Sequence, residues 1–180
     1  MRVPSSITVT APELYWLPKV SWQVFGHLTF RDDRTFEEAI LKRFFPLVYQ
    51  VPKATGRPLK KVLWCLRREC RLGGNVHLHF CMGGLGKNAD IARHSKLLRT
   101  TWRKCGGGIN ETERYIRSKN GIGYILKELD RPSVQFRESA KFVWGNGQVM
   151  ISHSVWGHLR HRFSSSSAAP SQYQEVSAER

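Results

Sequence analysis

Two strand-like segments joined by a glycine-containing turn constrain the fold of this chain more than any other feature. Residues 60–70 (KKVLWCLRREC) and 75–82 (NVHLHFCM) are rich in aliphatic, aromatic and Cys side chains, and the RLGGN between them is typical of a β-hairpin turn. Successive side chains of a strand point to opposite faces, so His77 and His79 share one face and the apolar residues around them share the other. The sequence therefore predicts a hairpin with one apolar face and one face that carries two imidazoles.

The spacing of apolar residues predicts an α+β fold around this hairpin. Further strands are expected at 20–30, 109–116 and 140–146, and helices within 32–50, 88–108 and 119–129. Elements in this order are typical of one antiparallel sheet with helices packed against it. We therefore expect a single domain over 1–163, with a central antiparallel sheet of about five strands flanked by helices. Residues 164–180 are rich in Ser and Ala and are expected to form a disordered tail.

Capping and breaking residues predict where two of the helices begin and end. Thr35 and Glu38 have the spacing of a capping box at the start of the first helix, and Pro46 should end or kink that helix. Asn88 is the expected N-cap of the second helix, and the three glycines at 106–108 should stop it.

The charge of the chain points to a polyanionic partner. Lys and Arg number 29 against 14 Asp and Glu, which gives a formal net charge of +15, and the excess lies before the tail. Such a surface attracts nucleic acid first and acidic membranes second, although a generally solubilising surface or a ribosome-associated protein would show the same excess. We find no apolar run of ~20 residues, no signal peptide and no CxxC pair, so we expect a cytoplasmic protein with reduced cysteines and no membrane partner.

His77 and His79 suit either a divalent metal ion or a phosphate group. A metal ion commonly adds a carboxylate to imidazole ligands, and the preceding strand offers one acid, Glu69, which falls near the position opposite His77. The alternative is that these are hydrogen-bonded histidines of a sheet and that Glu69 pairs with a neighbouring arginine. His27 and His94 are expected to have structural roles.

The third predicted helix places a tyrosine and a lysine on the side away from the core. Its apolar residues gather on one side, and Tyr124 and Lys127, one turn apart, lie on the other. A phenol has a pKa of ~10 and needs a nearby cation or metal ion to act as a nucleophile at neutral pH. Gly121 and Gly123 are expected to leave space ahead of Tyr124. Tyr115 is a rival nucleophile, although packing or base stacking is the more expected role for it.

The second predicted helix offers a basic side. Four cations spaced along it could follow a phosphate backbone. These candidate DNA-binding residues are Arg93, Lys96, Arg99 and Arg103.

Taken in order, three short motifs resemble those of the HUH single-strand DNA endonucleases, especially the initiators of rolling-circle replication from plasmids and small DNA viruses. The motifs are FGHLTF at 25–30, HLH at 77–79 and YILK at 124–127. The resemblance covers residues 22–129. It implies a HUH-type fold and a site-specific nicking endonuclease encoded by a plasmid, a phage or another mobile element.

The resemblance also implies a role for each residue of the site. His77, His79 and Glu69 would bind Mg²⁺ or Mn²⁺, which would polarise the scissile phosphate of single-stranded DNA or of an origin hairpin. Tyr124 would attack that phosphate to leave a 5′-phosphotyrosine and a free 3′-OH, and Lys127 would position it or neutralise charge. The chain has no GxxxxGK[ST] motif, so unwinding would fall to a separate helicase.

Other functions remain open on the sequence alone. A single-tyrosine transposase or a relaxase belongs to the same class, although relaxases commonly carry three histidines together. HLT at 27–29 and HLH at 77–79 faintly resemble the paired motifs of the 2H phosphoesterases, which use no metal. A non-catalytic nucleic-acid-binding module is the third possibility.

Overall fold

One antiparallel sheet organises the part of the chain that the structure describes. The computed structural model describes residues 6–9, 13–31, 37–70, 76–126 and 149–157. Six strands lie in the order β1-β6-β3-β4-β2-β5, and every pairing between them is antiparallel. The strands are β1 (Ser6–Val9), β2 (Trp22–Phe30), β3 (Leu63–Cys70), β4 (Val76–Gly83), β5 (Gly107–Arg114) and β6 (Val149–Ser152).

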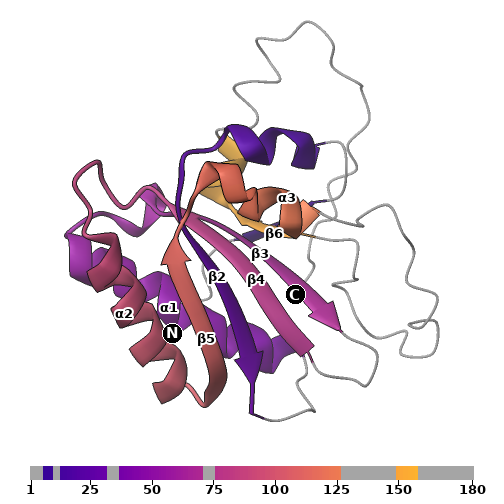
Figure 1. The fold of residues 1–180 in the computed structure, drawn as a ribbon, viewed down its shortest axis with the longest axis vertical. Helices are drawn as coiled ribbons and strands as arrows, with labels where there is room; N and C mark the ends of the chain where they lie inside the picture. The colour runs from indigo at the N-terminus through magenta and orange to yellow at the C-terminus, as the bar shows by residue number, and fades with distance from the viewer. Residues whose placement is uncertain (1–5, 10–12, 32–36, 71–75, 127–148, 158–180) are drawn as a thin grey trace, which may run out of the picture.

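Helices pack against both faces of this sheet, which confirms the expected α+β class and single domain. Two long helices, α1 (Glu37–Thr55) and α2 (Ile91–Lys104), lie together on one side of it (Figure 1). The short helix α3 (Gly121–Leu126) contacts β4 from the other side and also contacts the 3-10 helix η1 (Glu13–Lys19). Two further 3-10 turns are η2 (Leu59–Lys61) and η3 (Arg117–Lys119).

Each face of the sheet has its own core. On the α1/α2 face, Leu28, Leu78 and Phe80 are fully buried in one cluster with side chains of both helices. On the α3 face, Cys65 and Cys81 are buried in a second cluster with Ile122 of α3 and with residues of β6. The alternation of side chains along each strand therefore divides the interior into two layers.

The two strands of the predicted hairpin pair with each other, and the structure defines their register. β3 and β4 pair so that Glu69 lies directly opposite His77, and Arg67 lies directly opposite His79. β4 also pairs with β2 on its other side, and this pairing sets His27 opposite His79. Glu69, Arg67 and His27 consequently share the face of the two predicted histidines.

Two predicted helix boundaries are wrong. The first helix does not end at Pro46: α1 runs from Glu37 to Thr55 with Pro46 and Pro52 inside it. The apolar side chains that follow Pro46, including Leu47 and Val51, are buried in the first core, and this packing outweighs the lost backbone hydrogen bond. The N-cap of α2 is Asp90 and not Asn88, because the Asp90 carboxylate accepts a hydrogen bond from the Arg93 amide at 3.0 Å.

Several other expectations concern the ends of the fold. β1, β6 and η1 were not predicted. The capping residue Thr35, the predicted strand at 140–146 and the predicted tail at 164–180 lie outside the described residues. None of the helices within the described ranges is long and apolar enough to cross a membrane.

Candidate functional site

Three charged or titratable side chains of the β3–β4 hairpin meet on the α3 face of the sheet. The Nε2 atoms of His77 and His79 lie 2.8 and 3.2 Å from the same oxygen, Oε2 of Glu69. Both imidazoles are buried, and Glu69 is half-buried. The structure thus brings together the three residues that the sequence analysis singled out as possible metal ligands.

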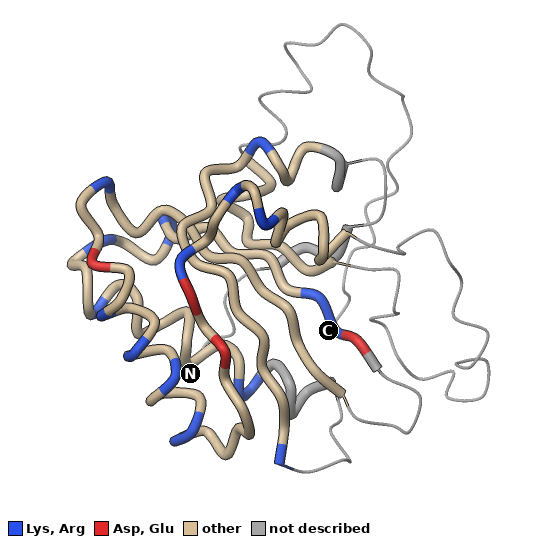
Figure 2. The backbone as a smooth tube through the Cα atoms, in the orientation of Figure 1, with Lys and Arg blue, Asp and Glu red and all other residues tan. Residues whose placement is uncertain are grey.

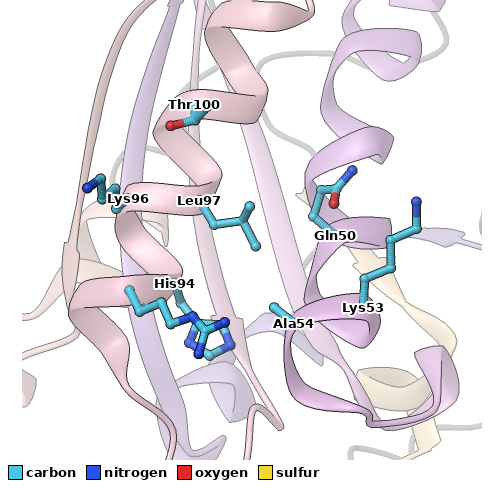
Figure 3. Close-up of a pocket in the computed structure, with 8 residues that line it drawn as sticks. Gln50, Lys53, Ala54, His94, Lys96, Leu97 and Thr100 are labelled. Atoms are coloured by element: carbon cyan, nitrogen blue, oxygen red, sulfur yellow. The ribbon is translucent and has the colours of Figure 1, made fainter.

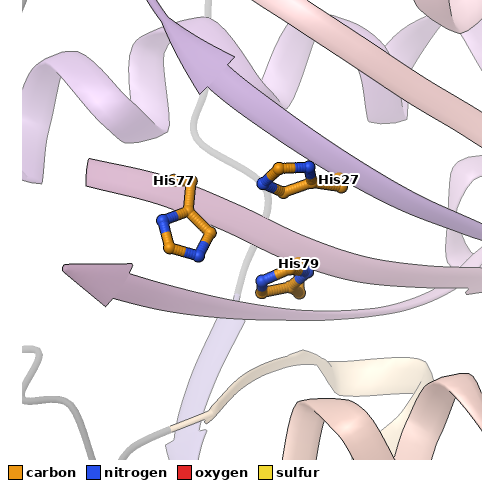
Figure 4. A group of neighbouring side chains, drawn as sticks. All are labelled: His27, His77 and His79. Atoms are coloured by element: carbon orange, nitrogen blue, oxygen red, sulfur yellow. The ribbon is translucent and has the colours of Figure 1, made fainter. Parts of the chain in front are cut away.

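His27 joins this cluster from the neighbouring strand. Its ring stacks on that of His79 with centroids 4.8 Å apart and meets the ring of His77 edge-on at 5.1 Å (Figure 4). The Nε2 atom of His27 is buried and has no hydrogen-bond partner among the described residues. Its Nδ1 faces Glu111 of β5 at 3.7 Å. His27 was expected to be structural, and the structure places it instead at the centre of the candidate site.

The three histidines form a group that could hold a metal ion. Each offers one nitrogen, and these nitrogens all lie within 4.8 Å of one another. Two nitrogens bound to one ion at ~2.1 Å lie about 3.0 to 3.4 Å apart at octahedral or tetrahedral angles, so the three rings would have to move together by up to roughly 1.5 Å for all of them to bind it. Two observations fit an ion at this place: the buried Nε2 of His27 lacks a partner within the part of the chain that the structure describes, and His77 and His79 share one carboxylate oxygen.

The electrostatics of the cluster favour the protonation states that metal binding requires. Hydrogen bonds from His77, and then from His79, hold the pKa of the Glu69 carboxyl well below its usual range. Burial lowers the pKa of His27, and the two neighbouring imidazoles lower it further. An ionised carboxylate and a neutral imidazole are the forms that bind a cation. In their present contacts the Nε2 atoms of His77 and His79 donate to Glu69, so these nitrogens could bind an ion only after their protons move to Nδ1 or to solvent.

Tyr124 lies against the histidine cluster. Its ring meets that of His79 edge-to-face with centroids 4.8 Å apart. Ile122 and Ile125 of the same helix are buried in the second core, as the apolar pattern predicted, while Tyr124 remains 41% exposed. The tyrosine is thus held next to the possible metal ligands and is still open to a ligand from solvent.

The glycines before Tyr124 make room for protein side chains and not for open space. A Cβ atom at Gly121 would lie 2.9 Å from the Phe25 ring, and one at Gly123 would lie 2.1 Å from the Asn120 side chain. Asn120 adopts a left-handed conformation, with φ of 50°, and its side-chain oxygen accepts a hydrogen bond from the Gly123 amide at 3.1 Å. The space expected ahead of Tyr124 is therefore filled by the protein itself: Gly121 allows α3 to start close to Phe25 of β2, and Gly123 accommodates the Asn120 side chain.

The sequence offered two further candidates besides Tyr124, namely Lys127 of the same predicted helix and Tyr115 of the strand expected before it. Lys127 lies outside the described residues. Tyr115 is half-buried and packs against the second core. Burial raises the pKa of its phenol, which makes Tyr115 a poorer nucleophile than an exposed tyrosine.

The basic side of α2 lies in the layer opposite the histidine cluster. Lys and Arg positions follow α2, whereas β5 carries two acidic positions (Figure 2). Arg93, Lys96 and Arg103 are exposed, and Arg99 is half-buried with Nη1 donating to the Thr112 carbonyl of β5 at 3.2 Å. Because α2 packs on the face away from His77, these four cations do not line the candidate site.

A groove of about 420 Å³ lies between α1 and α2 next to this basic side. Figure 3 shows Gln50 and Lys53 of α1 facing Leu97 and His94 of α2. His94 is buried, and its Nδ1 donates to the Asp90 carbonyl at 2.6 Å in the first turn of α2. This bond is a structural role, as expected for His94.

Two residues of the cluster were not assigned to the site from the sequence, although each left a signal there. His27 shares a strand face with Phe25 and Thr29, so a pairing of that strand with HLH would have set it beside the other histidines. Arg67 shares a strand face with Glu69 in the same way. The contact of Arg67 with α3 depends on tertiary packing and has no such signal.

Searches of protein-family models, of curated proteins and of solved structures found no match to this chain. The candidate site therefore rests on the geometry of its own residues.

Proposed function

We propose that this protein is a metal-dependent endonuclease that nicks single-stranded DNA through a covalent tyrosine intermediate, as in initiators of rolling-circle replication. The observation that carries the proposal is the contact of the Tyr124 ring with His79, inside a cluster that also holds His77, Glu69 and His27. A partly exposed phenol and a set of metal ligands side by side are what phosphodiester transesterification needs. The strongly basic chain fits a nucleic acid substrate.

The chemistry is a transfer of one phosphodiester bond. The phenolic oxygen of Tyr124 attacks the scissile phosphorus and gives up its proton. The bond from phosphorus to the 3′ oxygen breaks, and that oxygen leaves as a 3′-OH while the 5′ phosphate stays bound to the tyrosine. The energy of the bond is kept in the phosphotyrosine, so a 3′-OH can later reverse the step and rejoin the strand. Unwinding of the duplex is left to a separate helicase.

The ligand set favours Mn²⁺ over Mg²⁺. Mg²⁺ prefers oxygen ligands, whereas imidazoles suit transition metals. The ligand set here would comprise three nitrogens, from His27, His77 and His79, and one carboxylate, from Glu69. The bound ion would supply Lewis-acid polarisation of the scissile phosphate. The residues of this chain would hold the ligands in place: β2, β3 and β4 each contribute at least one of them.

The test is a search for a covalent protein–DNA adduct. The protein is incubated with Mn²⁺ and a pool of single-stranded oligonucleotides of random sequence, and a denaturing gel separates any adduct. We expect an adduct that survives denaturation and disappears with EDTA and in Tyr124→Phe. Tyr115→Phe is the matched control, because it removes the hydroxyl of the nearby half-buried tyrosine, and it should keep the adduct.

The controls separate this function from its rivals. An adduct that persists in Tyr124→Phe and vanishes in Tyr115→Phe would contradict the assigned nucleophile. Binding without an adduct on any DNA, including hairpins and origin-like sequences, would leave a nucleic-acid-binding module as the better description. A transposase or relaxase would give the same adduct and would be distinguished by the sequences that it joins.

A metal-independent phosphoesterase is the second candidate, because His27 and His79 face each other across adjacent strands. Two facing imidazoles can act as acid and base on an RNA end. This function would leave Glu69 and Tyr124 without a role. Cleavage of RNA that is unaffected by EDTA and by Tyr124→Phe would favour it over the nickase.

A further inference from the structure

A buried guanidinium connects the strand that carries Glu69 to the helix that carries Tyr124. Arg67 of β3 lies directly opposite His79, and its side chain is 4% exposed. Its Nη1 donates to the main-chain carbonyl of Ile125 at 2.6 Å, and its Nη2 lies 3.7 Å from Oε1 of Glu69. Ile125 directly follows Tyr124 in α3. One side chain therefore contacts both a possible metal ligand and the helical turn that bears the phenol.

The two oxygens of the Glu69 carboxylate have different partners. Oε1 faces Arg67, while Oε2 faces the Nε2 atoms of His77 and His79. A buried guanidinium is stable only where charge and hydrogen-bonding partners surround it, and its planar fork can donate in two fixed directions at once. Arg67 therefore orients the carboxylate so that Oε2 points at the imidazoles.

The helix that carries Tyr124 depends on such contacts. The described part of α3 is only six residues long, and a helix of this length is not stable by itself. Its described anchors are the buried Ile122 and Ile125, the ring contact of Tyr124 with His79, and the bond from Arg67. Among these, the bond from Arg67 is directional and reaches from the metal-ligand strand.

We propose that Arg67 is a positioning residue that sets the distance between the Tyr124 hydroxyl and the metal ligands. This inference rests on the proposed nicking function and identifies the residue that holds the nucleophile at a fixed distance from the candidate metal ligands. A displacement of the nucleophile by about 1 Å can slow a reaction by roughly 100-fold without loss of substrate binding. The role therefore predicts a defect in the chemical step and not in DNA affinity.

Arg68 provides the matched control. It is the next residue of the same strand and is also buried, but it pairs with Leu78 and its side chain points to the α1/α2 face. Arg67→Lys and Arg68→Lys each replace a buried guanidinium of β3 by an ammonium group. A merely structural cost of that change should appear in both variants, whereas a positioning role should appear only in Arg67→Lys.

The experiment measures three quantities in the full chain. The first is the single-turnover rate of adduct formation at saturating Mn²⁺ and saturating oligonucleotide, and the second is the oligonucleotide Kd. The third is the paramagnetic relaxation of the Tyr124 ring resonances by bound Mn²⁺ without DNA, which reports the distance from the ion to the tyrosine. For Arg67→Lys we expect a rate about 10- to 100-fold lower, an unchanged Kd and weaker relaxation. Arg68→Lys should match the wild type in all three.

The outcomes separate the inference from the function on which it rests. Equal effects of the two variants, or no effect of Arg67→Lys, would overturn the positioning role. If the wild type binds Mn²⁺ but forms no adduct on any DNA, the proposed function fails, and the relaxation of Tyr124 alone decides the role of Arg67. A wild type that binds no Mn²⁺ would overturn both. If Arg67→Lys does not fold, Arg67→Gln replaces it, since the amide keeps a donor for one of the two contacts.

Discussion

The two faces of strand β4 show how one strand can serve stability and chemistry at once. On one face Leu78 and Phe80 have no exposed surface and pack under α1 and α2. On the other face His77 and His79 are almost as buried, yet their neighbours are Glu69, Arg67 and His27, which are polar. Burial on the first face removes apolar surface from water, which is favourable. Burial on the second face is tolerated because charges and hydrogen bonds compensate one another.

Packing of the apolar face of β4 holds the histidine face in place. The strand cannot shift by one residue without exchanging Leu78 and Phe80 for the imidazoles in the core under α1. The apolar pattern therefore fixes the register that brings Glu69 opposite His77. Substitutions on the apolar face should therefore change stability, and substitutions on the histidine face should change metal binding.

The largest expected effect is a loss of stability on the apolar face. The Phe80 ring is fully buried and meets the Phe44 ring with centroids 5.7 Å apart. Phe80→Ala should lower the free energy of unfolding by about 3–5 kcal/mol, because it leaves a cavity in the core. Urea titration followed by circular dichroism measures this change. The folded fraction should still bind Mn²⁺ with wild-type affinity, and a parallel loss of metal affinity would show that the two faces are not separable.

The next effect belongs to the histidine face and should appear only with metal. Mn²⁺ at about 100 times its Kd should stabilise the wild type by about 2.7 kcal/mol. His77→Ala should reduce Mn²⁺ affinity by at least roughly 100-fold and abolish this stabilisation, since a ligand matters at least as much as a supporting residue. His153→Ala, at an exposed histidine outside the cluster, is the control and should keep it. Thermal unfolding with and without Mn²⁺ gives both numbers.

The same titration distinguishes the ligands that join His77 and His79. Glu69→Gln should weaken Mn²⁺ binding more than His27→Ala. Among the described residues, Glu69 has the only carboxylate that contacts both His77 and His79, and its negative charge would attract the ion. The reverse order would make the three histidines the principal ligand set.

A moderate effect is expected on the apolar face, where β2 and β4 approach each other through a glycine. Gly26 lies opposite Phe80, and a Cβ atom built on it would lie 2.1 Å from the Phe80 ring. Gly26→Ala should destabilise the protein by about 1–3 kcal/mol through overpacking. The loss should shrink in a Phe80→Leu background, because the two changes share one contact. Additive losses, measured by the same urea titrations, would contradict the close approach of this ring.

The smallest effect concerns cations on the two sides of the sheet. Arg117 and Lys119 are exposed on η3, directly before α3, whereas Arg93 and Lys96 are exposed on α2 in the opposite layer. For a short single-stranded oligonucleotide, replacing the η3 pair by Ala should reduce the slope of log K against log salt by about 1. Replacing the α2 pair should change the slope only for longer or hairpin DNA that reaches the other layer. Fluorescence anisotropy at several salt concentrations measures both, and equal effects on the short oligonucleotide would contradict this assignment.

Local patterns in the sequence predicted much of the sheet and part of the site. The RLGGN sequence and the apolar runs beside it were sufficient to predict a hairpin with Glu69 near the position opposite His77, because a hairpin is a local structure. The exact register came from the structure, which pairs Glu69 with His77. The amphipathic pattern likewise predicted that Ile122 and Ile125 are buried and that Tyr124 is not. Both predictions depend only on residues that are close together in the sequence.

Contacts between distant segments could not be predicted in the same way. The place of His27 depends on the pairing of β2 with β4 across the whole of α1, and the contact of Arg67 with Ile125 spans 58 residues. β1 pairs with β6 at the other end of the chain, so its four residues carried no signal of their own. The continuation of α1 past Pro46 depends on packing in the first core, which is built from segments distant in the sequence.

The order of the site residues along the chain has a consequence for a protein that is synthesised from its N-terminus. His27, Glu69, His77 and His79 are all translated before Tyr124, and they lie on three adjacent strands, of which the central β4 pairs with both β2 and β3. A nascent chain that ends before α3 would thus contain every candidate metal ligand and no tyrosine at that site. Under the proposed function, the capacity to hold an ion would therefore precede the capacity to cut DNA.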